Sequence, residues 1–249
     1  MKTVLITGAS SGYGRATALH FHAQGWNVIA TMRTPRPGVL PESDRLRVVA
    51  LDVTKPETIA AAFEAAGPID VLVNNAGVPS IGVFEGTPMD RVREVFETNT
   101  FGVMATTQAV LPQFRERGSG VVINVTSSVV LGHMPLSAVY KASKMAVEGF
   151  TASLSLELAP FGVQAKTVEP GACLTTNFAA SATNGTSVDE LVPAPYATWA
   201  KKTMDSFTGQ DQFTKESDVA ETVWRAAHDT TGQLRFPAGP DAVWLAQAK

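Results

Sequence analysis

The fold is decided near the start of the chain by the run Thr7-Gly8-Ala9-Ser10-Ser11-Gly12-Tyr13-Gly14. An apolar run, Val4–Ile6, precedes it, and a segment with helical spacing, Ala16–Ala23, follows it. Glycine permits left-handed turns and a close approach of the backbone to a ligand. The start of a helix offers free amide protons to an anion. Glycines also occur in ordinary turns, but between a strand and a helix this spacing predicts a loop that holds the phosphates of a dinucleotide.

Outward from this loop, apolar runs alternate with helical segments. Further strands are expected at Val28–Met32, Leu46–Leu51, Ile69–Val73, Val121–Thr126, Val163–Val168 and Leu234–Phe236. Further helices are expected at Ile59–Ala66, Met89–Arg117, Ser137–Ala159 and Glu216–His228. The strands are continuous apolar runs, which is typical of strands that are buried on both faces. The alternation predicts one α/β domain over residues 1–249, a doubly wound parallel sheet of Rossmann type with helices on both faces.

One segment, at about residues 176–215, interrupts the alternation. It is rich in Ser, Thr, Pro and Gly and contains scattered aromatic residues. Because it follows the sixth expected strand, it should lie at the carboxyl edge of the sheet, where open α/β sheets bind ligands. A long irregular insertion in this place is typical of a binding lid, although a plain surface loop is the alternative.

Composition excludes several classes of protein. A net charge of −3 does not favour nucleic acid or an anionic membrane as a partner. The single cysteine, Cys173, cannot form an intrachain disulfide and favours a reducing compartment, so we expect a cytoplasmic protein. The first residues lack a signal-peptide pattern, and no apolar run is long enough to span a membrane. His20 and His22 do not face each other on a helix, and we expect no metal site.

The end of the second strand bears on the choice of cofactor. In NAD-binding folds an acid at this place binds the ribose 2′-hydroxyl, whereas an Arg accommodates a 2′-phosphate. Here Met32 stands at the position of the acid and Arg33 follows it. A guanidinium binds phosphate as a planar fork, and the hydroxyl of Ser11 can assist. The sequence therefore predicts NADP(H), with a solvated loop cation at Arg33 as the alternative.

Three motifs together resemble the short-chain dehydrogenase/reductase family in its compact, single-domain subtype. They are TGxxxGxG at residues 7–14, Asn74-Asn75-Ala76-Gly77, and Tyr140-Lys141-Ala142-Ser143-Lys144, which matches YxxxK. The resemblance spans Lys2 to Phe236 and implies an NADP(H)-dependent oxidoreductase acting on a carbonyl or alcohol. Tyr13 stands where the family usually has an aliphatic residue.

The spacing of Tyr140 and Lys144 places both side chains on one face of a helix. A phenol has an ordinary pKa near ~10, and we expect the nearby ammonium and an oxidised nicotinamide ring to lower the pKa of Tyr140. Tyr140 is then the general acid or base. The resemblance implies that Ser127, rather than its neighbour Ser128, binds the substrate oxygen. It also implies that Asn99 holds a water linking Lys144 to solvent, although a polar residue that bends the helix is the alternative there.

The resemblance assigns further residues around the cofactor. Asp52 and Val53 would hold the adenine, while the Asn74–Gly77 motif would line the cofactor and stabilise the sheet. Within that motif the residues expected at the cofactor are Asn74, Ala76 and Gly77. A second stretch, which resembles the family's PGxxxT motif, would orient the carboxamide of the nicotinamide; its residues are Pro170, Gly171, Cys173 and Thr175. A nucleophilic cysteine needs a nearby base, and no His is close to Cys173 in sequence, so Cys173 is expected only to line the site.

Apolar and aromatic residues follow the fifth strand and continue into the insertion, as is usual for a small-molecule site. Besides Ser127, the candidate substrate residues are Val129, His133, Leu136, Phe178, Trp199, Met204 and Phe207. They predict a ketoreductase or carbonyl reductase for a medium-sized, mostly apolar ketone or secondary alcohol. By resemblance, the two long helices Met89–Arg117 and Ser137–Ala159 are expected to form a homodimer or homotetramer.

Two rival functions are less consistent with the motifs. A non-catalytic NADP-sensing regulator would use the same fold but is expected to lack Tyr140 or Lys144, and both are present. A sugar-nucleotide epimerase or dehydratase of the extended subtype is expected to show G-x2-G-x2-G and a longer C-terminal substrate region, whereas the spacing here is G-x3-G-x-G. Because the fold alone proves no activity, the argument depends on the site residues.

Overall fold

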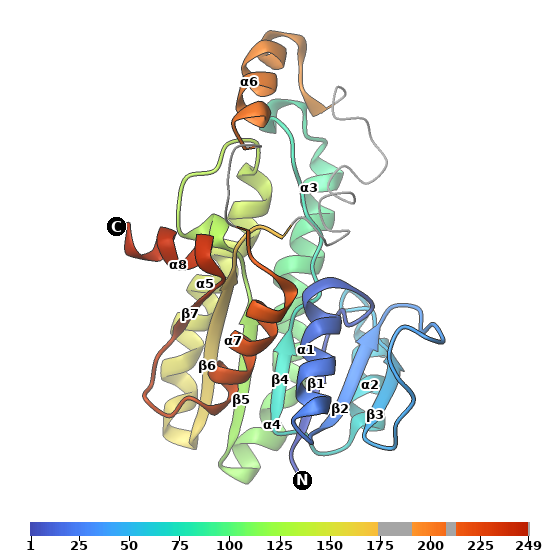
Figure 1. Ribbon diagram of the computed structural model, residues 1–249. Coiled ribbons are helices and arrows are strands. Elements are labelled where there is room, and N and C mark those ends of the chain that lie inside the picture. The colour runs from blue at the N-terminus through green and yellow to red at the C-terminus, as the bar shows by residue number, and fades with distance from the viewer. Residues whose placement is uncertain (174–190, 208–212, 249) are drawn as a thin grey trace.

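The computed structural model describes residues 1–173, 191–207 and 213–248. Within these residues a seven-stranded sheet has the order β3-β2-β1-β4-β5-β6-β7, and neighbouring strands are parallel (Figure 1). The strands are β1 (Thr3–Ile6), β2 (Asn27–Met32), β3 (Leu46–Ala50), β4 (Val71–Asn74), β5 (Gly120–Val125), β6 (Val163–Pro170) and β7 (Arg235–Ala238). The prediction of a doubly wound parallel sheet is therefore confirmed.

Helices cover both faces of the sheet because successive strand residues point to opposite sides. On β1, Val4 and Ile6 pack toward α1 (Gly12–Ala23) and α7 (Glu216–His228). The intervening Leu5 packs toward the opposite layer, in a cluster with residues of three other helices. These helices are α2 (Pro56–Ala66), α4 (Gly102–Arg117) and α5 (Ala138–Leu158).

The strand order reverses beside β1, which pairs with β2 on one side and with β4 on the other. At such a point the connections that follow the two neighbouring strands run in opposite directions. A crevice therefore forms between the loops at the carboxyl ends of these strands. The loop that follows β1 and the loop that follows β4 both begin at this crevice. The fold therefore brings the glycine-rich run and the Asn74–Gly77 motif to the same edge of the sheet.

The predicted long helix Met89–Arg117 is interrupted. The structure has α3 (Met89–Phe96), a π-helical turn at Glu97–Phe101, and then α4. The turn holds Asn99 and Thr100 in the interior, where the hydroxyl of Thr100 donates to the Ser143 carbonyl at 3.0 Å. π-helical turns are rare in proteins, but those that occur are often found at functional sites. The extra residue in such a turn moves side chains out of the regular helical register.

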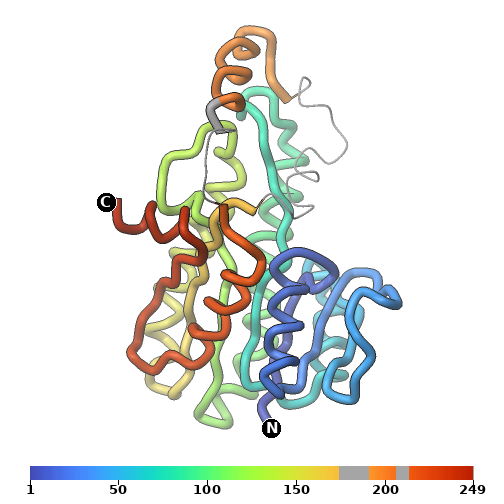
Figure 2. The backbone as a smooth tube through the Cα atoms, viewed as in Figure 1, coloured from blue at the N-terminus to red at the C-terminus, as the bar shows by residue number. Residues whose placement is uncertain are grey.

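Two helices depart from the sequence-based expectation. Within the segment predicted to be irregular, a 3₁₀ turn at Ala194–Tyr196 leads into α6 (Ala197–Phe207), which lies beyond the carboxyl edge of the sheet (Figure 2). After β7 the chain forms α8 (Pro240–Gln247), which the sequence analysis did not predict. Proline at the first helical position has no amide to lose there and is pre-set for the helix.

Two features of other protein classes are absent from the described ranges. None of their helices is both long and apolar enough to cross a lipid bilayer. The same ranges contain no group of three or more His, Cys, Asp and Glu residues that could hold a metal ion.

Candidate active site

At two of its glycines the glycine-rich loop is packed too tightly for a side chain. Gly8 has φ 69°, and a Cβ atom there would come within 2.8 Å of the Ala76 Cα. A Cβ atom on Gly14 would lie 2.4 Å from the Gly8 carbonyl oxygen. The side-chain amide of Asn75 donates to the carbonyls of Thr7 and Gly8 at 2.9 and 3.2 Å. Asn75, a member of the predicted Asn74–Gly77 motif, therefore fixes the loop from the β4 side.

The start of α1 suits an anion. Ser11 is the N-cap residue and its side chain makes no capping hydrogen bond, while the first turn contains no acidic residue. The first amides of a helix have no partner within the helix, so a ligand at this end can accept from them. Ser10 is half-buried and Ser11 is exposed beside these amides. The loop thus fits the diphosphate of a dinucleotide.

Arg33 and Asp52 lie at the ends of two neighbouring strands. Met32 is buried at the end of β2, whereas Arg33 is exposed. The Asp52 carboxylate accepts from the amide and hydroxyl of Thr54 at 3.0 and 2.8 Å. Burial acts to raise the pKa of Asp52, but these bonds and the nearby charge of Arg33 hold that pKa below its ordinary value. Arg33 is therefore available at the surface, close to the predicted adenine position of Asp52 and the buried Val53.

Asn74 holds the sheet together. Its side-chain amide donates to the Thr107 hydroxyl and to the Asn124 side-chain oxygen, both at 2.9 Å. Its own oxygen accepts from the Thr106 hydroxyl at 2.7 Å. The motif is expected both to line the cofactor and to stabilise the sheet. The side chain of Asn74 stabilises the sheet, because its hydrogen bonds join β4 to β5 and α4. Ala76 and Gly77 continue the loop toward the remaining site residues.

Ser127, Tyr140 and Lys144 meet at the carboxyl end of β5. The hydroxyl of Ser127 is hydrogen-bonded to the Tyr140 side chain. The Lys144 Nζ lies 5.9 Å from the centroid of the Tyr140 ring and donates to the Val125 carbonyl at 2.9 Å. Ser128, the alternative serine, is buried in the 3₁₀ turn at Ser128–Val130. The structure therefore brings together the three residues that the sequence analysis singled out.

In the protein alone, burial governs the ionisation of Tyr140 and Lys144. Burial raises the pKa of Tyr140 to about 12, and the bond to Ser127 acts in the opposite direction. Burial also lowers the pKa of Lys144 to about 8, against the charge of Glu148. The ammonium is directed at the Val125 carbonyl, and in the protein alone it does not produce the expected lowering of the Tyr140 pKa. At neutral pH the phenol is protonated and most of the lysine is charged.

Asn99 connects the loop after β4 to α5. Its side chain is fully buried, and its oxygen accepts from the Val78 amide at 2.8 Å. Its nitrogen donates to the Val78 carbonyl at 2.9 Å and to the Ser143 hydroxyl at 3.1 Å. A Cβ atom on Gly77 would lie 3.2 Å from the Asn99 oxygen and 3.5 Å from the Lys144 Nζ. Asn99 is therefore at the site, and its role toward a bound water stays a prediction.

The loop after β6 approaches the same group. Pro170 ends β6, and the Gly171 carbonyl accepts from the Tyr13 hydroxyl at 2.9 Å. Burial raises the pKa of Tyr13 above its ordinary value, and its neighbours Cys173 and Tyr140 act in the same direction. Cys173 is half-buried beside Tyr13, and its role in lining the site stays a prediction. Thr175 lies outside the described residues.

The predicted substrate residues fall into two groups. Val129 is buried in a cluster that includes Tyr140, and Leu136 is buried against Val83 and Ala200 of α6. His133 is exposed, and Trp199 and Met204 are 48% and 40% exposed on α6. Phe178 and the side chain of Phe207 lie outside what the structure describes.

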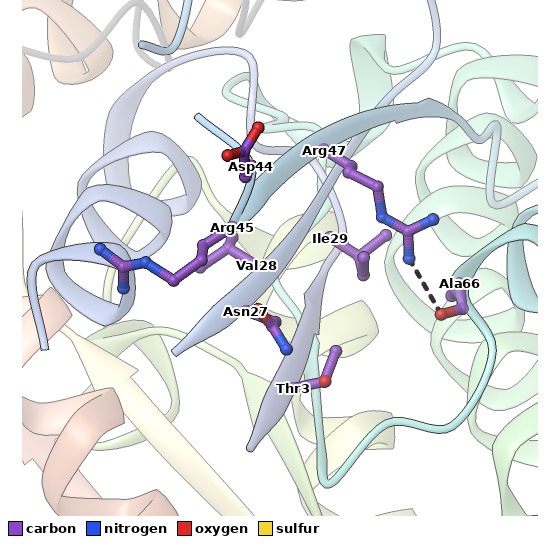
Figure 3. A pocket seen from close by; sticks show the side chains of 8 residues that line it. All are labelled: Thr3, Asn27, Val28, Ile29, Asp44, Arg45, Arg47 and Ala66. Carbon is purple, nitrogen blue, oxygen red and sulfur yellow. Dashed lines mark hydrogen bonds between the residues drawn. The ribbon is translucent and has the colours of Figure 1, made fainter. Parts of the chain in front are cut away.

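A separate cavity of about 300 Å³ lies at the opposite edge of the sheet, at the amino ends of β1 and β2 (Figure 3). It is lined by Thr3, Asn27, Val28, Ile29, Asp44, Arg45, Arg47 and Ala66. Arg47 donates to the carbonyls of Ala65 and Ala66, both at 3.1 Å, and Arg45 donates to the His22 carbonyl at 3.2 Å. Both arginines therefore bind the last carbonyls of helices, and the cavity is no part of the site around Tyr140.

Comparisons with solved structures support the same reading of the fold. A short-chain dehydrogenase from Streptomyces avermitilis is 36% identical and has a TM-score of 0.83, with 99% of this chain and 91% of that one covered. Serine dehydrogenase complexed with NADP+ is 27% identical, with a TM-score of 0.78 and 94% of each chain covered. A 3-ketoacyl-(acyl-carrier-protein) reductase from Brucella melitensis, complexed with NADH, is 28% identical, with a TM-score of 0.75 over 95% of this chain and 96% of that one.

Curated relatives match over much of the chain. The uncharacterized oxidoreductase YusZ of Bacillus subtilis is 38% identical over 96% of this chain and 89% of its own length. Retinol dehydrogenase 8 of Bos taurus is 39% identical over 70% of this chain and 60% of its own length. The family model for short chain dehydrogenases matches residues 2–186. The chain therefore belongs to the short-chain dehydrogenase family, and it is an oxidoreductase acting on CH–OH and C=O groups.

Proposed function

We propose that this chain is an NADP(H)-dependent carbonyl reductase or alcohol dehydrogenase for medium-sized, mostly apolar ketones or secondary alcohols. The observation that carries the proposal is the meeting of Ser127, Tyr140 and Lys144 beside the glycine-rich loop. A non-catalytic NADP-sensing regulator would have no need for this arrangement. When bound, the nicotinamide supplies or accepts the hydride.

The chain's own residues handle the proton. Tyr140 is protonated at neutral pH, so it can donate a proton to the oxygen of a ketone as that oxygen gains charge. The Ser127 hydroxyl, already bonded to Tyr140, is placed to donate to the same oxygen and to stabilise its charge. Lys144 keeps a positive charge at neutral pH, and together with the oxidised nicotinamide ring this charge would favour phenolate when the reaction runs toward oxidation.

The preference for NADP(H) rests on the end of β2. Similar solved structures hold NADP+ in one case and NADH in another, so the fold does not choose between the cofactors. Arg33 is exposed there with no acid at position 32, and it can bind a 2′-phosphate as a planar fork. A hydrogen bond of this kind contributes about 1.5–3 kcal/mol, or roughly ten- to a hundredfold in affinity.

The cofactor test compares kcat/KM for NADPH and NADH on one ketone. We expect the parent to favour NADPH and expect Arg33→Ala and Met32→Asp to reduce or invert the ratio. Arg93→Ala removes an equal charge from an exposed ion pair with Asp90 on α3 and should leave the ratio unchanged. A parent that prefers NADH, or an unchanged ratio in Arg33→Ala, would show that the 2′-phosphate is not read here.

The proposed substrate class rests on the apolar surroundings of Tyr140. Val129 packs in the same cluster as Tyr140, and Leu136 contributes to the wall shared with α6. The relative that acts on retinol supports an apolar substrate. A panel of aryl ketones, keto esters, steroid-like carbonyls and sugars, assayed with NADPH, tests this class. A clear preference for charged sugars would contradict it.

We also propose a homodimer or homotetramer in the cytoplasm. Phe101, Met145 and Leu156 are 53%, 46% and 76% exposed along the π-helical turn and α5. We infer that these exposed apolar side chains contribute to a contact with a second copy of the chain. A single cysteine is consistent with a reducing compartment.

A further inference from the structure

The peptide units that follow β6 are bonded to three distant parts of the chain. The Gly171 amide donates to the carbonyl of Ala238, the last residue of β7, at 3.0 Å. The Gly171 carbonyl accepts from the hydroxyl of Tyr13, in the first turn of α1, at 2.9 Å. Gly171 is buried, so its carbonyl depends on Tyr13 in place of water.

The next residue is bonded from the other side. The Ala172 amide donates to the carboxylate of Asp241, in the first turn of α8, at 2.7 Å. The Ala172 carbonyl accepts from the Thr214 amide at 2.9 Å, and the Thr214 hydroxyl donates to the second oxygen of Asp241. A Cβ atom on Gly171 would lie 2.0 Å from that oxygen, so the carboxylate can reach the loop only because residue 171 is glycine.

Both backbone groups of Gly171 and of Ala172 thus have a defined partner. The loop lies between the two parts of the proposed site. Tyr13, which is bonded to the loop, belongs to the glycine-rich run, and Cys173 and Tyr140 are close enough to Tyr13 to raise its pKa. A dinucleotide that places its phosphates on the glycine-rich loop and its reacting ring beside Tyr140 has to pass this loop.

We propose that Tyr13 and Asp241 are positioning residues that hold the Gly171–Cys173 loop in place for the nicotinamide end of the cofactor. The inference rests on the proposed function. A loop that is ordered before binding does not have to be ordered by the ligand, so affinity is higher. An aliphatic residue at position 13 could not donate to Gly171. An amide at position 241 would be uncharged and would place a donor NH2 where one of the two acceptor oxygens now bonds Ala172 or Thr214, so one of these two bonds would be lost or reversed.

Two ligands separate this role from general support of the fold. NADP+ reaches the loop, whereas 2′-phospho-ADP-ribose keeps the adenine and diphosphate but lacks the nicotinamide. Dissociation constants for both are measured by titration calorimetry on the full chain, without turnover. For Tyr13→Phe and for Asp241→Asn we expect about tenfold weaker binding of NADP+ and unchanged binding of the fragment.

Tyr196→Phe is the matched control, because it removes a tyrosine hydroxyl that donates to the exposed Glu85 at 2.8 Å, outside this loop. It should bind both ligands as the parent does. Equal losses for NADP+ and the fragment would reduce Tyr13 and Asp241 to structural residues and overturn the inference. Unchanged NADP+ binding in both variants would also overturn it. A parent that binds neither ligand would instead refute the proposed function on which the inference rests.

Discussion

Replacing Lys144 with methionine should abolish turnover and yet stabilise the protein at neutral pH. Lys144 is 4% exposed, and burial lowers its pKa from 10.5 to about 8. At 1.36 kcal/mol for each pKa unit, the buried ammonium destabilises the folded state by about 3 kcal/mol below that pKa. Methionine has a similar length and no charge, but it leaves the Val125 carbonyl without its donor, which costs about 1 kcal/mol.

The sign of the effect depends on pH. Below about pH 8 the folded and unfolded states both hold the Lys144 proton, and the cost of burial is present in full. Between about pH 8 and 10.5 the folded protein has released the proton while the unfolded chain retains it, so the free energy of unfolding of the parent rises with pH. Lys144→Met should therefore be more stable than the parent by about 2 kcal/mol near neutral pH. Near pH 10.5 it should be less stable by about 1 kcal/mol.

Urea unfolding of parent and variant at a series of pH values measures this difference directly, and a ketone assay with NADPH measures the loss of turnover. Lys202→Met, at an exposed lysine on α6, controls for the removal of a positive charge from the surface. If the difference between Lys144→Met and the parent is the same at every pH, the buried ammonium does not carry the cost argued here. Turnover near that of the parent would remove Lys144 from the mechanism.

Three further outcomes are expected. Tyr140→Phe should lower turnover by about 10²–10⁴-fold while NADP+ still binds in a calorimetric titration, because only the proton donor is lost; a near-normal kcat would remove Tyr140 from its role. Asn99→Ala should lower the free energy of unfolding in urea by roughly 2–4 kcal/mol, since it leaves the amide and carbonyl of Val78 without partners, and a change below about 1 kcal/mol would contradict this. Light scattering should give the mass of a dimer or tetramer, and a monomer mass at working concentration would count against the proposed assembly.

The sequence alone was sufficient for the parallel sheet and for the motif residues. Buried strands such as Val28–Met32 are continuous apolar runs, and this pattern can be read without knowing their neighbours. The glycine-rich run and the Tyr140–Lys144 pair are local motifs, because a turn or one helical repeat determines how their residues lie. Glu148 lies one helical repeat after Lys144, so the same spacing indicates that its carboxylate lies on the face that carries the ammonium.

Tertiary structure decided the properties that depend on contacts between distant segments. The pKa of Tyr140 rises because the surrounding elements exclude water, and the side chain of Asn99 turns to Val78 because a π-helical turn interrupts the predicted helix. Asp241 reaches the loop after β6 from a helix that the sequence pattern did not predict. A periodic pattern records which residues are buried, but not which groups meet in the interior. Desolvation and hydrogen-bond partners are set only when the chain closes on itself.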